Sequence, residues 1–133
     1  LGGLGRRVLV IGSGGLSHDP PVPALAGAPP EVRERLIAGG ALSAEARAAR
    51  QARVIDEGLR QAAGTSDCTP VNEAWDRALL SQLVARDFDA LTRYADEALT
   101  RDAGRGGHEV RCWIAAAAVM EALGAPPPRI EFY

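Results

Sequence analysis

The sequence contains no lysine, so all fifteen of its basic residues are arginines, and only 5% of its residues are aromatic. Without lysine, the chain has no side-chain amine for Schiff-base chemistry or for a lysine general base. A formal net charge of -2 gives no basic surface for phosphates, and the few aromatic rings give no stacking surface for bases. Nucleic acid is therefore not an expected partner.

Cysteine is scarce, and long apolar runs are missing. Cys68 and Cys112 lie far apart and neither belongs to a CxxC pair, so we expect free thiols in a reducing cytoplasm. The longest apolar run, residues 112–120, is too short to cross a bilayer, and no basic leader with a cleavage site opens the chain. These features predict a cytoplasmic protein with no membrane partner.

Two segments have the pattern of β-strands. Residues 7–11 form a short, largely β-branched run before a glycine-rich turn, as in a central strand buried on both faces, and residues 129–133 have the pattern of a second strand. We therefore predict an α/β fold: a mixed sheet flanked by helices, with a helical excursion between the first strand and the last helix. Two strands are few for a sheet, so we expect an incomplete domain.

The segment between these predicted strands contains the start and stop signals of several helices. Prolines before residue 31 and glycines at 39–40 delimit one short helix, and Ser43 caps a longer one running towards Gly64. Asn72 and Asp87 are the predicted N-caps of a third and a fourth helix, and a final helix ends before the glycine and prolines at 124–128. Each of the last four helices has an apolar stripe at helical spacing, listed in chain order: Val54, Ile55, Leu59; Trp75, Leu79, Leu80, Leu83; Phe88, Leu91, Ala95, Leu99; Val110, Trp113, Ile114, Ala117, Ala118.

His18 follows the first predicted strand, at the edge where open α/β sheets place their ligands. A glycine-rich turn and a loop stiffened by five prolines would hold its imidazole rigid but accessible, which suits a general acid or base. The plainer interpretation is a structural surface histidine. A phosphate-binding loop is disfavoured because the prolines prevent a helix from following directly, and Ser13 lacks the strand-turn-helix context of a hydrolase nucleophile.

His108 and Glu109 open the last predicted helix, and with His18 they supply two histidines and one carboxylate. That is the inventory of a non-haem iron facial triad. Adjacent residues of a helix, however, point about 100° apart, so at most one of this pair can bind the same ion. The alternative for Glu109 is an acidic residue favoured at a helix N-terminus by the helix dipole.

Residues 8–23, which read VLVIGSGGLSHDPPVP, resemble the catalytic-histidine segment of the class III extradiol dioxygenases, the superfamily of the protocatechuate 4,5-dioxygenase β subunit. The likeness continues through NEAWD at 72–76 and HEVRCW at 108–113, and so spans almost the whole chain. It implies that the chain is the C-terminal half of a single extradiol dioxygenase domain. Residues 1–29 would be the strand and catalytic loop, 30–103 the helical excursion, and 104–133 the metal-ligand helix and terminal strand.

The resemblance also implies a function: cleavage by O₂ of a catechol, such as 3-(2,3-dihydroxyphenyl)propionate, at a non-haem Fe(II) site of a homo-oligomeric enzyme of aromatic catabolism. His18 would be the acid/base residue and Glu109 one iron ligand, the two histidine ligands lying outside this sequence. Supporting residues of the substrate pocket would be Ser13, Gly14, Gly15, Asp19 and His108. Two alternatives stay open: a non-catalytic α/β interaction module, and another metal-dependent enzyme on the same scaffold.

Overall fold

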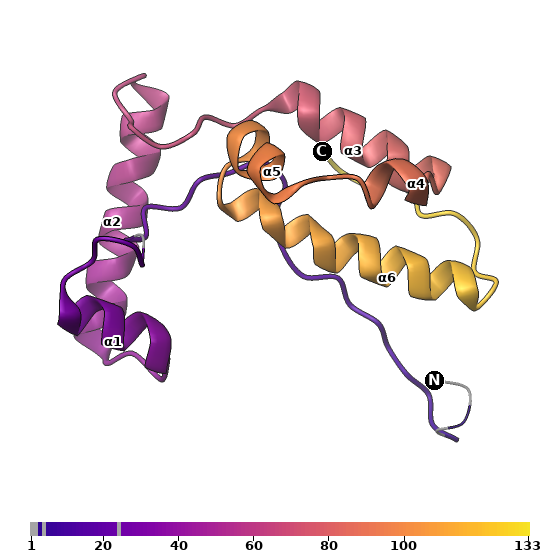
Figure 1. The fold of residues 1–133 in the computed structure, drawn as a ribbon, viewed down its shortest axis with the longest axis horizontal. Coiled ribbons are helices and arrows are strands. Elements are labelled where there is room, and N and C mark those ends of the chain that lie inside the picture. Colours follow the sequence, from indigo (N-terminus) through magenta and orange to yellow (C-terminus); the bar gives the residue numbers. More distant parts are fainter. Residues whose placement is uncertain (1–2, 4, 24) are drawn as a thin grey trace. The chain divides into compact units, whose positions relative to one another are not determined.

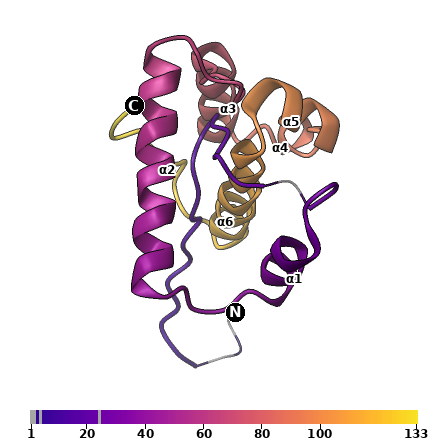
Figure 2. The same ribbon diagram turned by 90° about the vertical axis from the view of Figure 1, so that its left-hand side faces the viewer.

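The computed structural model describes residues 3, 5–23 and 25–133. The chain divides into two compact units, which we call the first unit (Leu1–Asp19 and Thr69–Tyr133) and the second unit (Pro20–Cys68). The six α-helices and the short 3₁₀-helix that follow are shown in Figures 1 and 2. No helix of the described ranges combines the length and the apolar character needed to cross a membrane.

The second unit contains two of the predicted helices, α1 (Pro30–Ala38) and α2 (Ala44–Ala62). The predicted cap of α2 is confirmed, since the hydroxyl of Ser43 accepts a hydrogen bond from the Ala46 amide at 3.2 Å. The apolar stripe of α2 is not a buried one: Val54, Ile55 and Leu59 are 50%, 56% and 67% exposed. Helical spacing fixes which residues share a face, but it does not determine whether anything covers that face.

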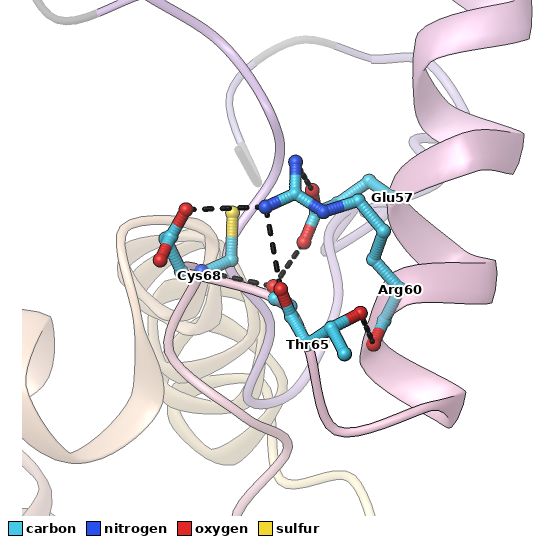
Figure 3. Close-up of polar contacts among 6 residues, drawn as sticks. Glu57, Arg60, Thr65 and Cys68 are labelled. Carbon is cyan, nitrogen blue, oxygen red and sulfur yellow. Dashed lines mark hydrogen bonds and ion pairs between the residues drawn. The ribbon is translucent and has the colours of Figure 1, made fainter.

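A polar cluster forms around the buried Glu57 near the C-terminal end of α2 (Figure 3). Ser66 donates a hydrogen bond to the Glu57 carboxylate, and the guanidinium of Arg60 lies 3.7 Å from the same group. The hydrogen bond from Ser66 outweighs the effect of burial and lowers the pKa of Glu57. The Cys68 amide donates to the Ser66 hydroxyl at 2.9 Å, so the cluster orders the turn that leads to the half-buried side chain of Cys68.

The first unit holds the hydrophobic core. It comprises α3 (Glu73–Ala85), α4 (Phe88–Leu91), α5 (Asp96–Ala103), the 3₁₀-helix η2 (Gly106–Glu109) and α6 (Val110–Ala122). The buried cluster draws at least one residue from each of the four α-helices: Leu79, Leu83, Leu91, Leu99 and Val110. All five belong to the apolar stripes predicted from the sequence. The caps at Asn72 and Asp87 are confirmed as well, with hydrogen bonds of 3.1 and 3.0 Å to the amides of Trp75 and Ala90.

The predicted fourth helix is interrupted, because α4 ends at Leu91 and α5 begins at Asp96. Tyr94 lies in the gap, where its ring meets Trp75 edge-on at 5.7 Å and its hydroxyl donates to Gln82 at 2.8 Å. Both partners belong to α3. Packing of Tyr94 onto α3 therefore accompanies a break that the apolar periodicity alone did not reveal.

The prediction of an α/β fold with a mixed sheet is wrong, because no strand occurs anywhere in the described ranges. Residues 7–11 and 129–133, both predicted strands, form no regular secondary structure. Leu9, Ile11 and Phe132 are 81%, 73% and 95% exposed. A β-branched run favours an extended backbone, but a strand exists only where a neighbour pairs with its N–H and C=O groups, and neither segment has such a neighbour here.

Candidate functional site

The backbone of His18 is held between α5 and η2. Its amide donates to the Ala103 carbonyl at 2.9 Å, and its carbonyl accepts from the Gly106 amide at 3.0 Å. This approach needs glycine at 104, where φ is +73° and a Cβ would lie 2.5 Å from the His18 carbonyl oxygen. The loop that carries His18 is thus fixed to the start of the last helical segment by main-chain bonds.

The imidazole of His18 has a defined orientation. Its Nδ1 lies 2.8 Å from the carbonyl oxygen of Leu16. A carbonyl can only accept, so Nδ1 carries the proton and Nε2 of the neutral ring keeps its lone pair. No hydrogen bond from the described residues reaches Nε2, and the His18 residue is only partly buried.

The carboxylate of Glu109 also lies next to Gly15. Its Oε2 accepts a hydrogen bond from the Gly15 amide at 2.9 Å. A Cβ on Gly15 would stand 3.0 Å from Cε1 of His18 and 3.9 Å from Oε2 of Glu109, so one point lies close to both side chains. The structure therefore brings the two principal predicted site residues together, from positions 91 apart in the chain.

The glycine-rich turn permits this convergence. Gly14 has φ +147°, and a Cβ there would lie 2.6 Å from the Cβ of Glu109. A Cβ on Gly12 would lie 2.9 Å from the Cys112 carbonyl oxygen in α6. Gly14 and Gly15, predicted as pocket residues, thus act through the absence of side chains, whereas Ser13 is exposed.

Sequence reasoning missed the contribution of Asp76, which is 2% exposed in the first turn of α3. Its Oδ1 accepts from the Ser17 amide at 2.8 Å and its Oδ2 from the Ser17 hydroxyl at 3.0 Å. The Ser17 hydroxyl in turn accepts from the Asn72 amide at 2.7 Å. The residue before His18 is thereby bound to α3. Asp76 belongs to the NEAWD motif at 72–76, which is part of the family resemblance, but no local sequence pattern pairs it with Ser17.

Asp19, predicted as a pocket residue, joins three parts of the first unit. Its Oδ1 accepts from Nε of Arg105 at 2.7 Å and its Oδ2 from the Thr69 amide at 3.1 Å. Burial by itself would raise the pKa of Asp19, but the hydrogen bonds from Arg105 and Thr69 and the positive charge of Arg105 outweigh it and lower the pKa. Asp19 therefore holds the loop beside His18 as a carboxylate.

His108 points to partners other than Gly15. Its Nε2 lies 2.8 Å from the Thr100 hydroxyl in α5, and its Nδ1 lies 3.2 Å from the Arg111 guanidinium. His108 and Glu109, which both lie in the 3₁₀-helix η2, thus have separate sets of partners. Within the described residues, no group of three or more His, Cys, Asp or Glu side chains could hold a metal ion.

Comparisons with known proteins point to the same chemistry as the motifs. Residues 4–127 match the family model described as the catalytic LigB subunit of aromatic ring-opening dioxygenase. Two relatives named 2,3-dihydroxyphenylpropionate/2,3-dihydroxicinnamic acid 1,2-dioxygenase, from Paraburkholderia xenovorans and Cupriavidus pinatubonensis, are 54% and 50% identical over 129 residues. A relative of the same name from a Rhodococcus species is 50% identical over 130 residues.

These alignments cover 97% to 98% of the chain but only 41% of each relative. The chain therefore spans about two fifths of the length of the curated relatives that it matches. No solved structure matches the chain.

Proposed function

We propose that this chain, which belongs to the family of the catalytic LigB subunit of aromatic ring-opening dioxygenases, contributes the acid/base residue and one metal ligand to an extradiol dioxygenase. The proposed substrates are O₂ and a catechol such as 3-(2,3-dihydroxyphenyl)propionate, in line with the names of the relatives. Cytoplasmic location and homo-oligomeric assembly stay predictions from the sequence and its family resemblance.

The observation that carries the proposal is the placement of both His18 and Glu109 close to Gly15. An imidazole whose Nε2 has no hydrogen-bond partner in the fold can accept a proton, and a carboxylate beside it can bind a cation. His108, by contrast, has both ring nitrogens engaged by neighbouring side chains. The pair is the arrangement required of a proton-transfer group next to a metal ligand.

The carboxylate of Glu109 fits one position of a ferrous site. The Gly15 amide binds Oε2 and orients the group, while no hydrogen bond from the described residues reaches Oε1. Carboxylate oxygen combined with imidazole nitrogen is the ligand set of non-haem Fe(II) oxygenases. The two imidazoles would come from the part of the protein that this sequence does not include. Iron(II), when bound, would supply the redox chemistry between the catechol and O₂.

His18 would move protons at Nε2. As a base, Nε2 would accept a proton from a catechol hydroxyl, and the carbonyl of Leu16 would stabilise the resulting imidazolium through Nδ1–H. As an acid, the same Nε2–H would return the proton to an oxygen atom when the ring opens. The main-chain bonds to Ala103 and Gly106 would keep the ring in place through both steps.

The test is made in the full-length protein with three variants. His18→Ala is expected to keep its iron but to lose a factor on the order of 10² to 10⁴ in turnover, the usual contribution of a general acid/base residue. Glu109→Ala is expected to lose iron, because it removes the anionic ligand. His108→Ala is the comparison for iron binding, since it removes an imidazole whose partners are Thr100 and Arg111, and it should keep its iron.

Iron content is measured by atomic absorption, and turnover by O₂ uptake with a catechol. Wild-type turnover in His18→Ala would remove His18 from the chemistry, and full iron occupancy in Glu109→Ala would refute the ligand assignment. A wild-type protein that takes up no O₂ with any catechol would favour a non-catalytic module.

A further inference from the structure

The Asp76 carboxylate is an anion almost without solvent, and its partners include no cation among the described residues. It accepts three hydrogen bonds, from the amide and hydroxyl of Ser17 at 2.8 and 3.0 Å and from the Tyr133 hydroxyl at 3.3 Å. Taking a carboxylate out of water is costly unless hydrogen bonds compensate it. Stabilising α3 alone would not require this, because the side chain of Asn72 already caps that helix.

The contact between Asp76 and Ser17 also determines where the Leu16 carbonyl points. The amide of Ser17 and the carbonyl of Leu16 belong to one peptide group, which is planar and trans, so N–H and C=O point in opposite directions. Asp76 Oδ1 binds the N–H at 2.8 Å, and the C=O on the opposite side lies 2.8 Å from Nδ1 of His18. A carboxylate, a peptide group and an imidazole thus form one continuous hydrogen-bonded chain.

We propose that Asp76 is a positioning residue for His18, which acts through the Leu16–Ser17 peptide group. Its negative charge polarises the peptide and makes the Leu16 carbonyl a stronger acceptor, as expected for linked hydrogen bonds in a medium of low dielectric constant. The stronger acceptor keeps the proton of the neutral ring on Nδ1 and leaves Nε2 free to exchange a proton with the substrate. The peptide group takes the place of the direct carboxylate–histidine contact that orients many functional histidines. This inference rests on the proposed function of His18.

The first test compares Asp76→Asn with Ser17→Ala in the full-length, iron-loaded protein. Asp76→Asn keeps the shape of the side chain but removes the charge, and we expect kcat to fall on the order of 10- to 100-fold, with KM for the catechol and iron content unchanged. Ser17→Ala removes one hydrogen bond to Asp76 and the acceptor for the Asn72 amide, but it keeps the peptide N–H that Asp76 binds. It should lower the unfolding midpoint and leave kcat within about threefold of wild type.

Two kinetic results would overturn the proposal: an Asp76→Asn variant with wild-type kcat, or a Ser17→Ala variant that loses as much kcat as Asp76→Asn. The second result would mean that Asp76 merely stabilises the fold. His18→Ala is assayed alongside. If that variant keeps full turnover, the proposed function fails; if it is inactive while Asp76→Asn is fully active, only the role of Asp76 fails.

A second measurement tests the proposal chiefly on the wild-type protein. Nitrogen-15 NMR of histidine-labelled, metal-free full-length protein distinguishes a protonated Nδ1 from a protonated Nε2, and His18→Gln identifies the signal. We expect the neutral His18 ring to carry its proton on Nδ1 in the wild type, and Asp76→Asn to reduce that population. A wild-type His18 with its proton on Nε2 would contradict the proposal.

Discussion

Replacement of Gly106 by alanine should separate the stability of the fold from the position of the His18 imidazole. A Cβ at 106 would lie 2.1, 2.3 and 2.4 Å from Nε2, Cε1 and Cδ2 of His18, where real Cβ atoms keep at least 3.0 Å. The ring must therefore move by roughly 1 Å or rotate away and give up its bond to Leu16. A lost hydrogen bond costs about 1 kcal/mol, and the smaller conformational freedom of alanine in the unfolded chain returns about 0.4–1 kcal/mol.

The expected result is an unfolding free energy within about 1 kcal/mol of wild type, together with turnover lowered on the order of 10²-fold, since a misplacement of about 1 Å can cost that much. Urea unfolding and O₂ uptake with a catechol measure the two quantities. Gly58→Ala is the matched control: nothing lies within 4 Å of its Cβ position in α2, so it should stabilise the fold by up to about 1 kcal/mol and keep full turnover. Wild-type turnover in Gly106→Ala would refute the structural position of the His18 ring.

Two further predictions concern stability. The pKa of Asp19 is lowered, so its contribution to stability should be complete above its ordinary pKa of 3.8 and should be lost as the pH falls below that value. Asp19→Asn should therefore be less stable than wild type at pH 7, and the difference should shrink in acid. A constant difference between the two proteins from pH 7 to pH 3 in thermal unfolding would contradict this. Leu79→Ala should lower the free energy of unfolding in urea by about 2–5 kcal/mol, because Leu79 is fully buried. Leu123→Ala, at a half-exposed site, should lower it by less than about 1 kcal/mol. Equal losses in the two variants would refute the assigned core.

The helix caps were the part of the fold most accurately predicted. Ser43, Asn72 and Asp87 each accept a hydrogen bond from an amide three residues later, so the whole interaction lies within four residues of sequence. The predicted strands were wrong because strand formation depends on distant parts of the chain. Whether residues 7–11 form a strand depends on a neighbour distant in the chain, and β-branched composition carries no information about that neighbour.

The same distinction between local and long-range interactions applies to the candidate site. His18 and Glu109 could be chosen from the sequence because their residue types and motifs indicate chemistry. The residues that position His18 could not be chosen from the sequence. Asp76 contacts Ser17, which is 59 positions away in the chain, and glycine is needed at 106 only because an imidazole lies close to it. On α2, helical spacing correctly grouped Val54, Ile55 and Leu59, but nothing local indicated that Glu57 rather than this stripe would be buried.

The carboxylate of Asp19 has one more consequence for the architecture. Asp19 and Thr69 are the residues of the first unit at which the chain departs into the second unit and returns, and a hydrogen bond of 3.1 Å joins them. For a flexible loop whose ends are held together, each doubling of its length costs only about 0.6 kcal/mol in closure entropy. By this relation, a flexible segment twice as long between Asp19 and Thr69 should cost only about 0.6 kcal/mol more in closure entropy.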